Sequence, residues 1–297
     1  MSDIFPAKWA IGPPAPSWLS YIARILMAAV LILVSHWVFA YLGGVALDPV
    51  SDGKGGNDTG HLFNYHPILM TLGFGVFMSE AIITYQAPLV SGISRPARKL
   101  VHMTLHILAA ISIIMGLLAA FKSHSLKLPV PIPDLYSPHS FLGLTAVTFV
   151  AVQVLVAFAS YVYPKTSLSH RMALGPVHRF LGMSTWIMGV AAMATGIQEK
   201  VTFIQMGKAL SGVDLYSNLV RIPAIILVLL PLLAMAVLYH QAPSAAASTS
   251  ASEHYLKESL LENNGVGSAV LAVSSRDGTH ARSNHGRRSV EQNEDNF

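Results

Sequence analysis

Long apolar segments alternate with short polar segments along most of the chain. Six of the apolar segments reach about 20 residues, the length that a helix needs to cross the hydrocarbon core of a bilayer. They cover roughly residues 18–42, 65–88, 100–121, 139–162, 177–197 and 219–240. Because a helix satisfies its own backbone hydrogen bonds in lipid, the pattern predicts an all-α protein, a bundle of six transmembrane helices.

The segments between the predicted helices, and the end of the chain, differ in composition. Residues 43–64 and 122–138 are rich in Gly, Asp and Pro, which is typical of loops. From residue 241 onward the chain is rich in Ser and Ala and then in charged and polar residues, so we expect this tail to be disordered. The predicted parts are an N-terminal segment (1–17), a transmembrane domain (18–240) and a C-terminal tail (241–297).

Composition supports a membrane protein and limits its chemistry. Of the 297 residues, 53% are hydrophobic and only 11% are charged, whereas about 25% of the residues in soluble domains are charged. The chain has no Cys, which excludes disulfides and thiolate metal ligands, but it has 13 His. Its net charge of +4 comes from basic residues scattered through the loops and the tail, so nothing indicates nucleic-acid binding.

Six crossings place both ends of the chain on the same side of the membrane. The predicted loops on that side contain six basic residues against one acidic residue, Asp3: Lys8, Arg95, Arg98, Lys99, Lys165 and Arg171. The opposite loops contain five basic residues, and the tail adds five to the first side. Basic loops tend to stay in the cytosol, so we expect both termini to be cytosolic. The sequon Asn57-Asp58-Thr59 then lies outside the cytosol. The pattern does not distinguish a vesicle, endolysosomal, vacuolar or plasma membrane.

Four histidines lie at matching ends of four predicted helices. The second and fourth helices run inward and begin near His66 and His139, whereas the third and fifth run outward and begin near His102 and His178. A single histidine there is usually an interfacial side chain that forms hydrogen bonds, but two pairs at matched depths are typical of bis-histidine haem ligation. We therefore predict one haem near each face. His106, four residues after His102 and on the same helix face, is an alternative ligand.

Four short motifs occur in the order and with the spacings of a known family. They are Phe63-Asn64-Tyr65-His66-Pro67-Ile68-Leu69-Met70, Lys99-Leu100-Val101-His102-Met103-Thr104-Leu105-His106, Leu135-Tyr136-Ser137-Pro138-His139-Ser140 and Pro176-Val177-His178-Arg179-Phe180-Leu181-Gly182. Over roughly residues 20–240 the chain resembles the cytochrome b561 family of transmembrane, ascorbate-dependent oxidoreductases. The resemblance implies four central helices that hold two haems b, one ligated by His66 and His139 and the other by His102 and His178.

The resemblance also implies a binding site at each face of the membrane. On the cytosolic side, Arg95, Lys99 and Arg171 match basic residues that bind ascorbate, and a basic pocket would attract this monoanion. Without the resemblance, the same residues are equally well explained as cytosolic anchors of the helices. On the other side, His124 and Tyr136 match an acceptor site. The implied contacts of the outer haem are Asp134, Leu135, Tyr136, Ser137 and Glu199.

Two positions depart from the family pattern, and one carboxyl group has no implied role. Pro138 precedes His139 where the family usually has Leu, and a helix tolerates Pro in its first turn. Gln86 stands where the family commonly has an Arg that contacts a haem propionate. Glu80 lies well inside the second helix, near the depth of the inner haem. It is either a functional carboxylate or a group that bonds a Ser or Thr.

The motifs and the resemblance together predict a membrane oxidoreductase. Cytosolic ascorbate would be the donor, and monodehydroascorbate or a ferric chelate on the other side would be the acceptor. The expected surroundings are the lipid bilayer and, as an open alternative, a second copy of the chain in a homodimer. Two other interpretations stay open. One is a two-haem anchor subunit that passes electrons to a quinone or a partner enzyme, and the other is a haem-free transporter or scaffold.

Overall fold

The structure is a computed structural model that describes residues 16–207 and 217–241. The predicted N-terminal segment and C-terminal tail therefore lie almost entirely outside the described residues. Six helical spans are long and apolar enough to cross a membrane. They are α1 (Ser17–Tyr41), a composite second span (Gly60–Ile83), α5 (Arg95–Ser125), α6 (Pro138–Tyr161), α7 (Leu168–Gly207) and α8 (Asn218–Gln241). The six-helix prediction is confirmed, and the protein is a multi-pass membrane protein.

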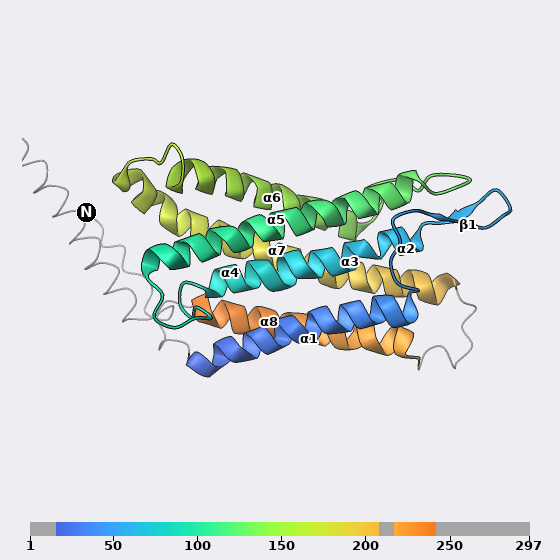
Figure 1. The fold of residues 1–297 in the computed structure, drawn as a ribbon, viewed down its shortest axis with the longest axis horizontal. Coiled ribbons are helices and arrows are strands. Elements are labelled where there is room, and N and C mark those ends of the chain that lie inside the picture. Colours follow the sequence, from blue (N-terminus) through green and yellow to red (C-terminus); the bar gives the residue numbers. More distant parts are fainter. Residues whose placement is uncertain (1–15, 208–216, 242–297) are drawn as a thin grey trace, which may run out of the picture. The chain divides into compact units, whose positions relative to one another are not determined.

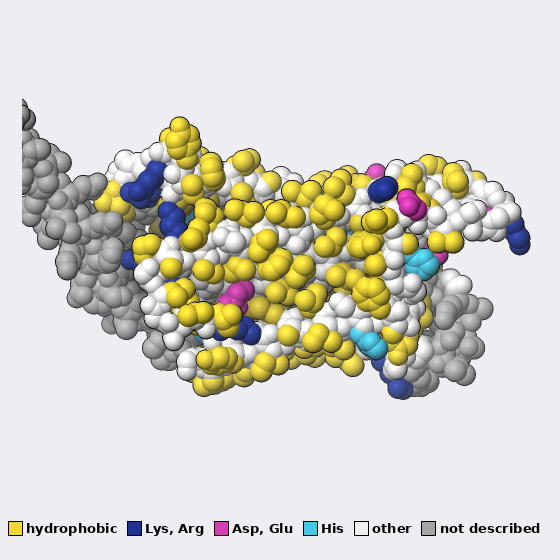
Figure 2. Space-filling model, viewed as in Figure 1, with side chains coloured by type: hydrophobic (Ala, Val, Ile, Leu, Met, Phe, Trp, Pro, Cys, Tyr) yellow, Lys and Arg dark blue, Asp and Glu magenta, His cyan; other side chains and the backbone are white. Residues whose placement is uncertain are grey.

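The helices pack as a bundle in which the composite second span is central (Figure 1). In the bundle, α1 packs along α8, α6 packs along α7, and α5 packs against the second span. The composite span consists of α2 (Gly60–Phe63), α3 (Tyr65–Met70), the π-helix η2 (Thr71–Met78) and α4 (Ser79–Ile83). Large apolar side chains such as Leu155 and Phe180 are exposed on the outside of the bundle. Figure 2 shows that hydrophobic side chains cover the middle of the visible face and that Lys and Arg lie mainly towards its two ends, as lipid-facing helices require.

Several helices extend beyond the apolar segments from which they were predicted. We expected α5 to begin near residue 100 and α7 near residue 177, but they begin at Arg95 and Leu168. The apolar segment marks only the part of a helix that lies in lipid, and the backbone hydrogen bonds continue into polar turns. Arg171, which we expected in a loop, therefore lies on a helix. Ser94 and Ser137 cap α5 and α6, each followed by Pro in the first turn.

The connection between α1 and α2, predicted as a loop, contains a small hairpin. Strands β1 (Val50–Ser51) and β2 (Asn57–Asp58) pair in antiparallel register. Asp52 closes the turn between them, because its Oδ1 accepts hydrogen bonds from the backbone N–H groups of Lys54 and Gly56, both at 2.8 Å. These hydrogen bonds hold the pKa of Asp52 below its usual value. The hairpin is too short to change the all-α class of the fold.

A backbone carbonyl of the π-helix η2 has two side-chain donors in the middle of the bundle. The Phe74 carbonyl accepts a hydrogen bond from the Trp186 indole N–H (3.1 Å) and another from the Ser79 hydroxyl (3.2 Å). Trp186 and Ser79 are fully buried. Buried polar groups need such partners, and these bonds join α7 to the second span. The second span is therefore fixed against α7 at mid-bundle.

Candidate functional site

His66 on α3 and His139 on α6 face each other at one end of the bundle, with their ring centres 6.1 Å apart. The Nδ1 of His66 lies 3.0 Å from the Gly116 carbonyl oxygen, and that of His139 lies 2.9 Å from the Ala192 carbonyl oxygen. A carbonyl oxygen only accepts, so both Nδ1 atoms carry the proton. The Nε2 atom of each ring therefore keeps its lone pair, as metal ligation requires.

His102 on α5 and His178 on α7 form a second pair towards the other end, with ring centres 6.4 Å apart. The Nδ1 of His102 donates to the Ala81 carbonyl oxygen at 2.8 Å. The Nδ1 of His178 has a side-chain partner instead, because the Gln153 amide lies 2.9 Å from it and 2.6 Å from the His178 carbonyl oxygen. Gln153 was not predicted, because a Gln in an apolar segment indicates that a partner exists but not which residue it is.

Both pairs have the spacing that suits a shared metal ion. Metal–imidazole nitrogen bonds are about 2 Å long, so two imidazoles on opposite sides of one metal have ring centres about 6 Å apart. Among the described residues, no group of three or more His, Cys, Asp or Glu side chains is arranged to hold a metal ion. A metal between two histidines would need its other ligands from a macrocycle. The residues present therefore fit haem.

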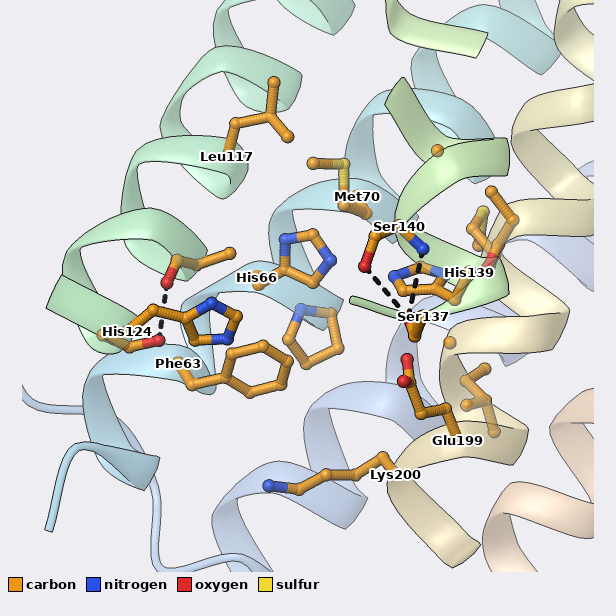
Figure 3. Close-up of a pocket in the computed structure, with 18 of the residues that line it drawn as sticks. Phe63, His66, Met70, Leu117, His124, Ser137, His139, Ser140, Glu199 and Lys200 are labelled. Atoms are coloured by element: carbon orange, nitrogen blue, oxygen red, sulfur yellow. Dashed lines mark hydrogen bonds between the residues drawn. The ribbon is translucent and has the colours of Figure 1, made fainter. Parts of the chain in front are cut away.

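A cavity of about 290 Å³ opens beside the pair of His66 and His139, which is called the outer pair after the orientation predicted from the sequence (Figure 3). Glycine keeps the helices close around it, because a Cβ atom on Gly196 would lie only 2.6 Å from the His139 ring. Its lining is largely apolar, with Met70, Leu117 and Phe63 among the residues near His66. All five residues expected to contact the outer haem line it: Asp134, Leu135, Tyr136, Ser137 and Glu199.

The expected acceptor residues lie together at the rim of this cavity. The Nδ1 of His124 lies 2.9 Å from a carboxylate oxygen of Asp134, and the rings of His124 and Tyr136 are 6.1 Å apart. Burial raises the pKa of Tyr136, and the negative charge of Glu199 adds to the effect. Tyr136 is therefore a neutral phenol at physiological pH.

Lys99, Arg171 and Lys165 lie near one another close to Tyr161, beside the pair of His102 and His178, which is called the inner pair after the orientation predicted from the sequence. Lys99 donates a hydrogen bond to the Tyr161 carbonyl oxygen at 2.8 Å, and the Tyr161 hydroxyl reaches the Arg171 carbonyl oxygen at 3.4 Å. The Tyr161 ring lies 5.8 Å from that of His178. The Nε of Arg171 is buried without a hydrogen-bond partner, and the charge of Lys165 also acts on Lys99. An anion would meet this excess of positive charge directly.

Arg95 lies near Tyr85, which packs against His102 of the inner pair. The Tyr85 ring is 5.2 Å from that of His102. Burial raises the pKa of Tyr85, and the positive charge of Arg95 opposes this shift. The structure thus brings together Lys99 and Arg171 and places Arg95 beside a different tyrosine. Tyr85 and Tyr161 were not predicted from the sequence, and Lys165 was predicted only as a basic residue of a cytosolic loop.

Three further residues singled out in the sequence have clear neighbours. The His106 ring packs 4.5 Å from that of His102. The Glu80 carboxylate forms an ion pair with Arg24 on α1 at 2.6 Å, whereas the threonine that bonds this residue, Thr84, reaches only its backbone carbonyl oxygen. Gln86 exchanges amide hydrogen bonds with Gln241 on α8, both at 3.1 Å.

Comparison with known proteins places the chain in a family. The family model for eukaryotic cytochrome b561 matches residues 65–204. Transmembrane ascorbate ferrireductase 2 of Arabidopsis thaliana is 36% identical over 209 residues, which cover 70% of this chain and 85% of the relative. The lysosomal membrane ascorbate-dependent ferrireductase CYB561A3 of Bos taurus is 33% identical over 203 residues, which cover 68% and 71%. This chain belongs to the cytochrome b561 family.

Proposed function

We propose that the protein is an oxidoreductase that carries electrons from ascorbate across a membrane, by way of two haems b, to an acceptor on the other side. The observation that carries the proposal is the two histidine pairs, at ring separations of 6.1 and 6.4 Å, towards opposite ends of one helix bundle. Relatives are named as ascorbate ferrireductases and as ascorbate-specific transmembrane electron transporters, which supports the donor and the direction of the chemistry.

The protein's part in this function is to hold and insulate the two sites. When bound, haem supplies the one-electron redox chemistry. His66 with His139 would hold one haem, and His102 with His178 would hold the other. The hydrogen bonds from Nδ1 to Gly116, Ala81 and Ala192 orient three of these rings and increase the basicity of Nε2. The buried Trp186 and its apolar neighbours exclude water from the region between the pairs.

The basic residues beside the inner pair form the proposed ascorbate site. Ascorbate is a monoanion at neutral pH, and Lys99, Arg171 and Arg95 would attract it. The buried Nε of Arg171 has a free N–H that an enolate oxygen of ascorbate would accept. Lys165 adds to the same positive field. Positive loops on this side also support cytosolic termini, with the transmembrane domain at 18–240 between them.

The rim of the outer cavity forms the proposed acceptor site. His124 is held by Asp134, and Tyr136 provides a neutral hydroxyl next to it. A ferric chelate or monodehydroascorbate would bind here by hydrogen bonds within reach of the outer pair. The names of the relatives favour ferric iron. Chelates compared with monodehydroascorbate as substrates of reconstituted protein would decide between them.

The test begins with purified full-length protein. We expect two haems b per chain in a haem assay, and reduction by ascorbate in the absorption spectrum. Lys99→Ala and Arg171→Ala should each raise the ascorbate concentration for half-maximal reduction about tenfold, because a hydrogen bond to a charged group contributes about 1.5–3 kcal/mol. Lys54→Ala, which removes an exposed charge from the hairpin, is the matched control.

Three results would each contradict one part of the proposal. Well-folded protein without haem bands would identify the haem-free transporter or scaffold. Two haems that ascorbate reduces equally well in Lys99→Ala, Arg171→Ala and wild-type protein would contradict the donor site and favour the anchor subunit. A protease-protected N-terminal tag in sealed cytosol-side-out vesicles would contradict the proposed orientation.

A further inference from the structure

Lys200 occupies the mouth of the outer cavity, where neither the histidine pair nor the acceptor residues account for it. It lies on α7 directly after Glu199, and both residues line the cavity. In Figure 3 the two side chains diverge: the Glu199 carboxylate points towards Ser137, whereas the Lys200 chain runs along the cavity towards Phe63. Two consecutive helix residues thus place opposite charges on two sides of one opening.

The Lys200 ammonium is separated from the outer histidine pair by a single aromatic ring. Its Nζ lies 5.1 Å from the centre of the Phe63 ring. The Phe63 ring is in turn 5.4 Å from that of His66. The positive charge therefore lies close to the proposed ligand His66, on the open side of the cavity.

Among the charged groups at this opening, His124 and Asp134 are bonded to each other, whereas Lys200 has only the face of Phe63. The Glu199 carboxylate points to the other side of the opening, where its charge acts on Tyr136. The charge of Asp58 acts on Lys200, but the two side chains do not reach ion-pair distance. Within residues 16–207 and 217–241, the Lys200 ammonium makes no hydrogen bond or ion pair. Its three N–H donors are available to a ligand.

We propose that Lys200 binds a carboxylate group at the mouth of the outer cavity. A half-buried ammonium that faces an apolar cavity pairs strongly with a carboxylate, because the hydrogen bonds are charge-assisted and water competes little. This inference rests on the proposed function, which would bring a carboxylate to this cavity from either of two sources. One is a propionate of the outer haem, and the other belongs to a ferric chelate such as ferric citrate.

The experiment compares Lys200→Met, which keeps the length of the side chain without its charge, with Lys200→Arg, which keeps the charge. Lys54→Met removes a positive charge on the same side from an exposed hairpin and is the control. All proteins are purified with haem. The readouts are the haem content per chain, a redox titration of both haems, and steady-state reduction of ferric citrate and of hexaammineruthenium(III), a cationic acceptor without carboxylates.

The two sources predict different results. If the partner is a propionate, Lys200→Met at least halves the retention of the outer haem, while Lys200→Arg and Lys54→Met do not. If the partner is the chelate, the haem content is unchanged. The KM for ferric citrate then rises at least threefold in Lys200→Met, and that for hexaammineruthenium(III) does not.

Two results would overturn the inference. In the first, Lys200→Met leaves the outer haem and the KM for ferric citrate unchanged. In the second, Lys200→Arg is as impaired as Lys200→Met, so that the charge is irrelevant. Retention of the inner haem in every variant verifies folding. The proposed function is tested separately, because it requires only that the wild-type protein binds haem and accepts electrons from ascorbate. A negative result for the Lys200 variants would therefore overturn this inference and leave the proposed function intact.

Discussion

Arg24 on α1 and Glu80 on α4 form a bidentate ion pair inside the helix bundle. Nε and Nη2 of Arg24 lie 2.9 and 2.6 Å from the two carboxylate oxygens, and Nη2 also donates to the Ala87 carbonyl oxygen at 2.7 Å. The side chains are only 17% and 18% exposed. Glu80 directly precedes Ala81, whose carbonyl oxygen accepts the hydrogen bond of His102. The pair therefore fixes the turn that orients a proposed haem ligand.

Removal of one member of this pair should destabilise the bundle strongly. Arg24→Met leaves the Glu80 carboxylate buried and unpaired, and breaking a buried ion pair destabilises by about 3–5 kcal/mol. We expect the double variant Arg24→Met with Glu80→Leu to recover most of this loss, because no uncompensated charge remains. Unfolding titrations of the detergent-solubilised protein measure both. Equal stability of the single and double variants would show that the pair is not coupled.

Close contact between η2 and α7 should make Gly189 intolerant of a side chain. A Cβ on Gly189 would overlap the Phe74 ring, which is itself buried. Gly189→Ala should destabilise by about 1–3 kcal/mol, the usual range for an overpacked core. Gly207→Ala, with no atom within 4 Å of the new Cβ, is the control and should have little effect. If Phe74→Leu does not rescue Gly189→Ala, the overlap is not the cause.

The sequence predicts the six spans and the depth of the four histidines because the bilayer itself sets these features. Bilayer thickness fixes the length of an apolar segment, and each crossing reverses the direction of the next helix. His66 with His139, and His102 with His178, follow from this alternation alone. Their rings lie 6.1 and 6.4 Å apart in the structure. Whether each pair ligates a haem stays a prediction.

Contacts between helices cannot be predicted from the sequence in this way, because they depend on the rotation of each helix about its own axis. Arg24 lies 56 positions from Glu80, and Gln153 lies 25 positions from His178. An Arg or Gln in an apolar segment indicates only that a partner exists. Tyr161, at the end of α6, and Lys165, in the turn after it, were not predicted as neighbours of the inner pair, because the ends of helices and turns show no periodicity. The hairpin at Val50–Asp58 has strands of two residues, too short for an alternating pattern.

Asn57 should carry no glycan, although it begins a sequon. Its Nδ2 donates to the Leu126 carbonyl oxygen at 2.8 Å, and its Oδ1 accepts from the Leu128 N–H at 2.9 Å. Lys127 Nζ also donates to the Asn57 carbonyl oxygen. The amide that a glycan would need therefore ties the hairpin to the segment after α5.

Glycosidase treatment of protein expressed in eukaryotic cells should leave its gel mobility unchanged. The positive control is Asp52→Asn with Lys54→Thr, which creates a sequon in the exposed turn of the same hairpin. That variant should gain a glycan. A mobility shift in the wild-type protein that Asn57→Gln abolishes would contradict the prediction and show that the hairpin opens before the chain folds.

Gln153 should strengthen haem binding at the inner site and not at the outer site. Loss of a partner that orients a metal-ligating histidine typically lowers metal affinity about 10–100-fold. Gln153→Leu removes the amide beside Nδ1 of His178, so we expect weaker haem retention at the inner site and an unchanged outer site. Redox titration and haem content measure this. Thr148→Val, on the exposed side of the same helix, is the control, because its hydroxyl bonds only to the Leu144 carbonyl. Equal losses from both haems would indicate general damage to α6.

His102, rather than His106, should be the α5 ligand of the inner haem. The two rings lie 4.5 Å apart, but only His102 has a hydrogen bond in the structure that fixes its Nδ1 proton, to Ala81, and its ring stands 6.4 Å from that of His178. His102→Ala should therefore lower haem content by about half and remove the inner signal. His106→Ala should keep both haems and change only the spectrum of the inner one, and His66→Ala should remove the outer haem alone.

Added imidazole should restore the inner signal in His102→Ala by occupying the vacated space. If His106→Ala abolishes the inner haem and His102→Ala spares it, the hydrogen bond to Ala81 orients a neighbour of the ligand and not the ligand itself.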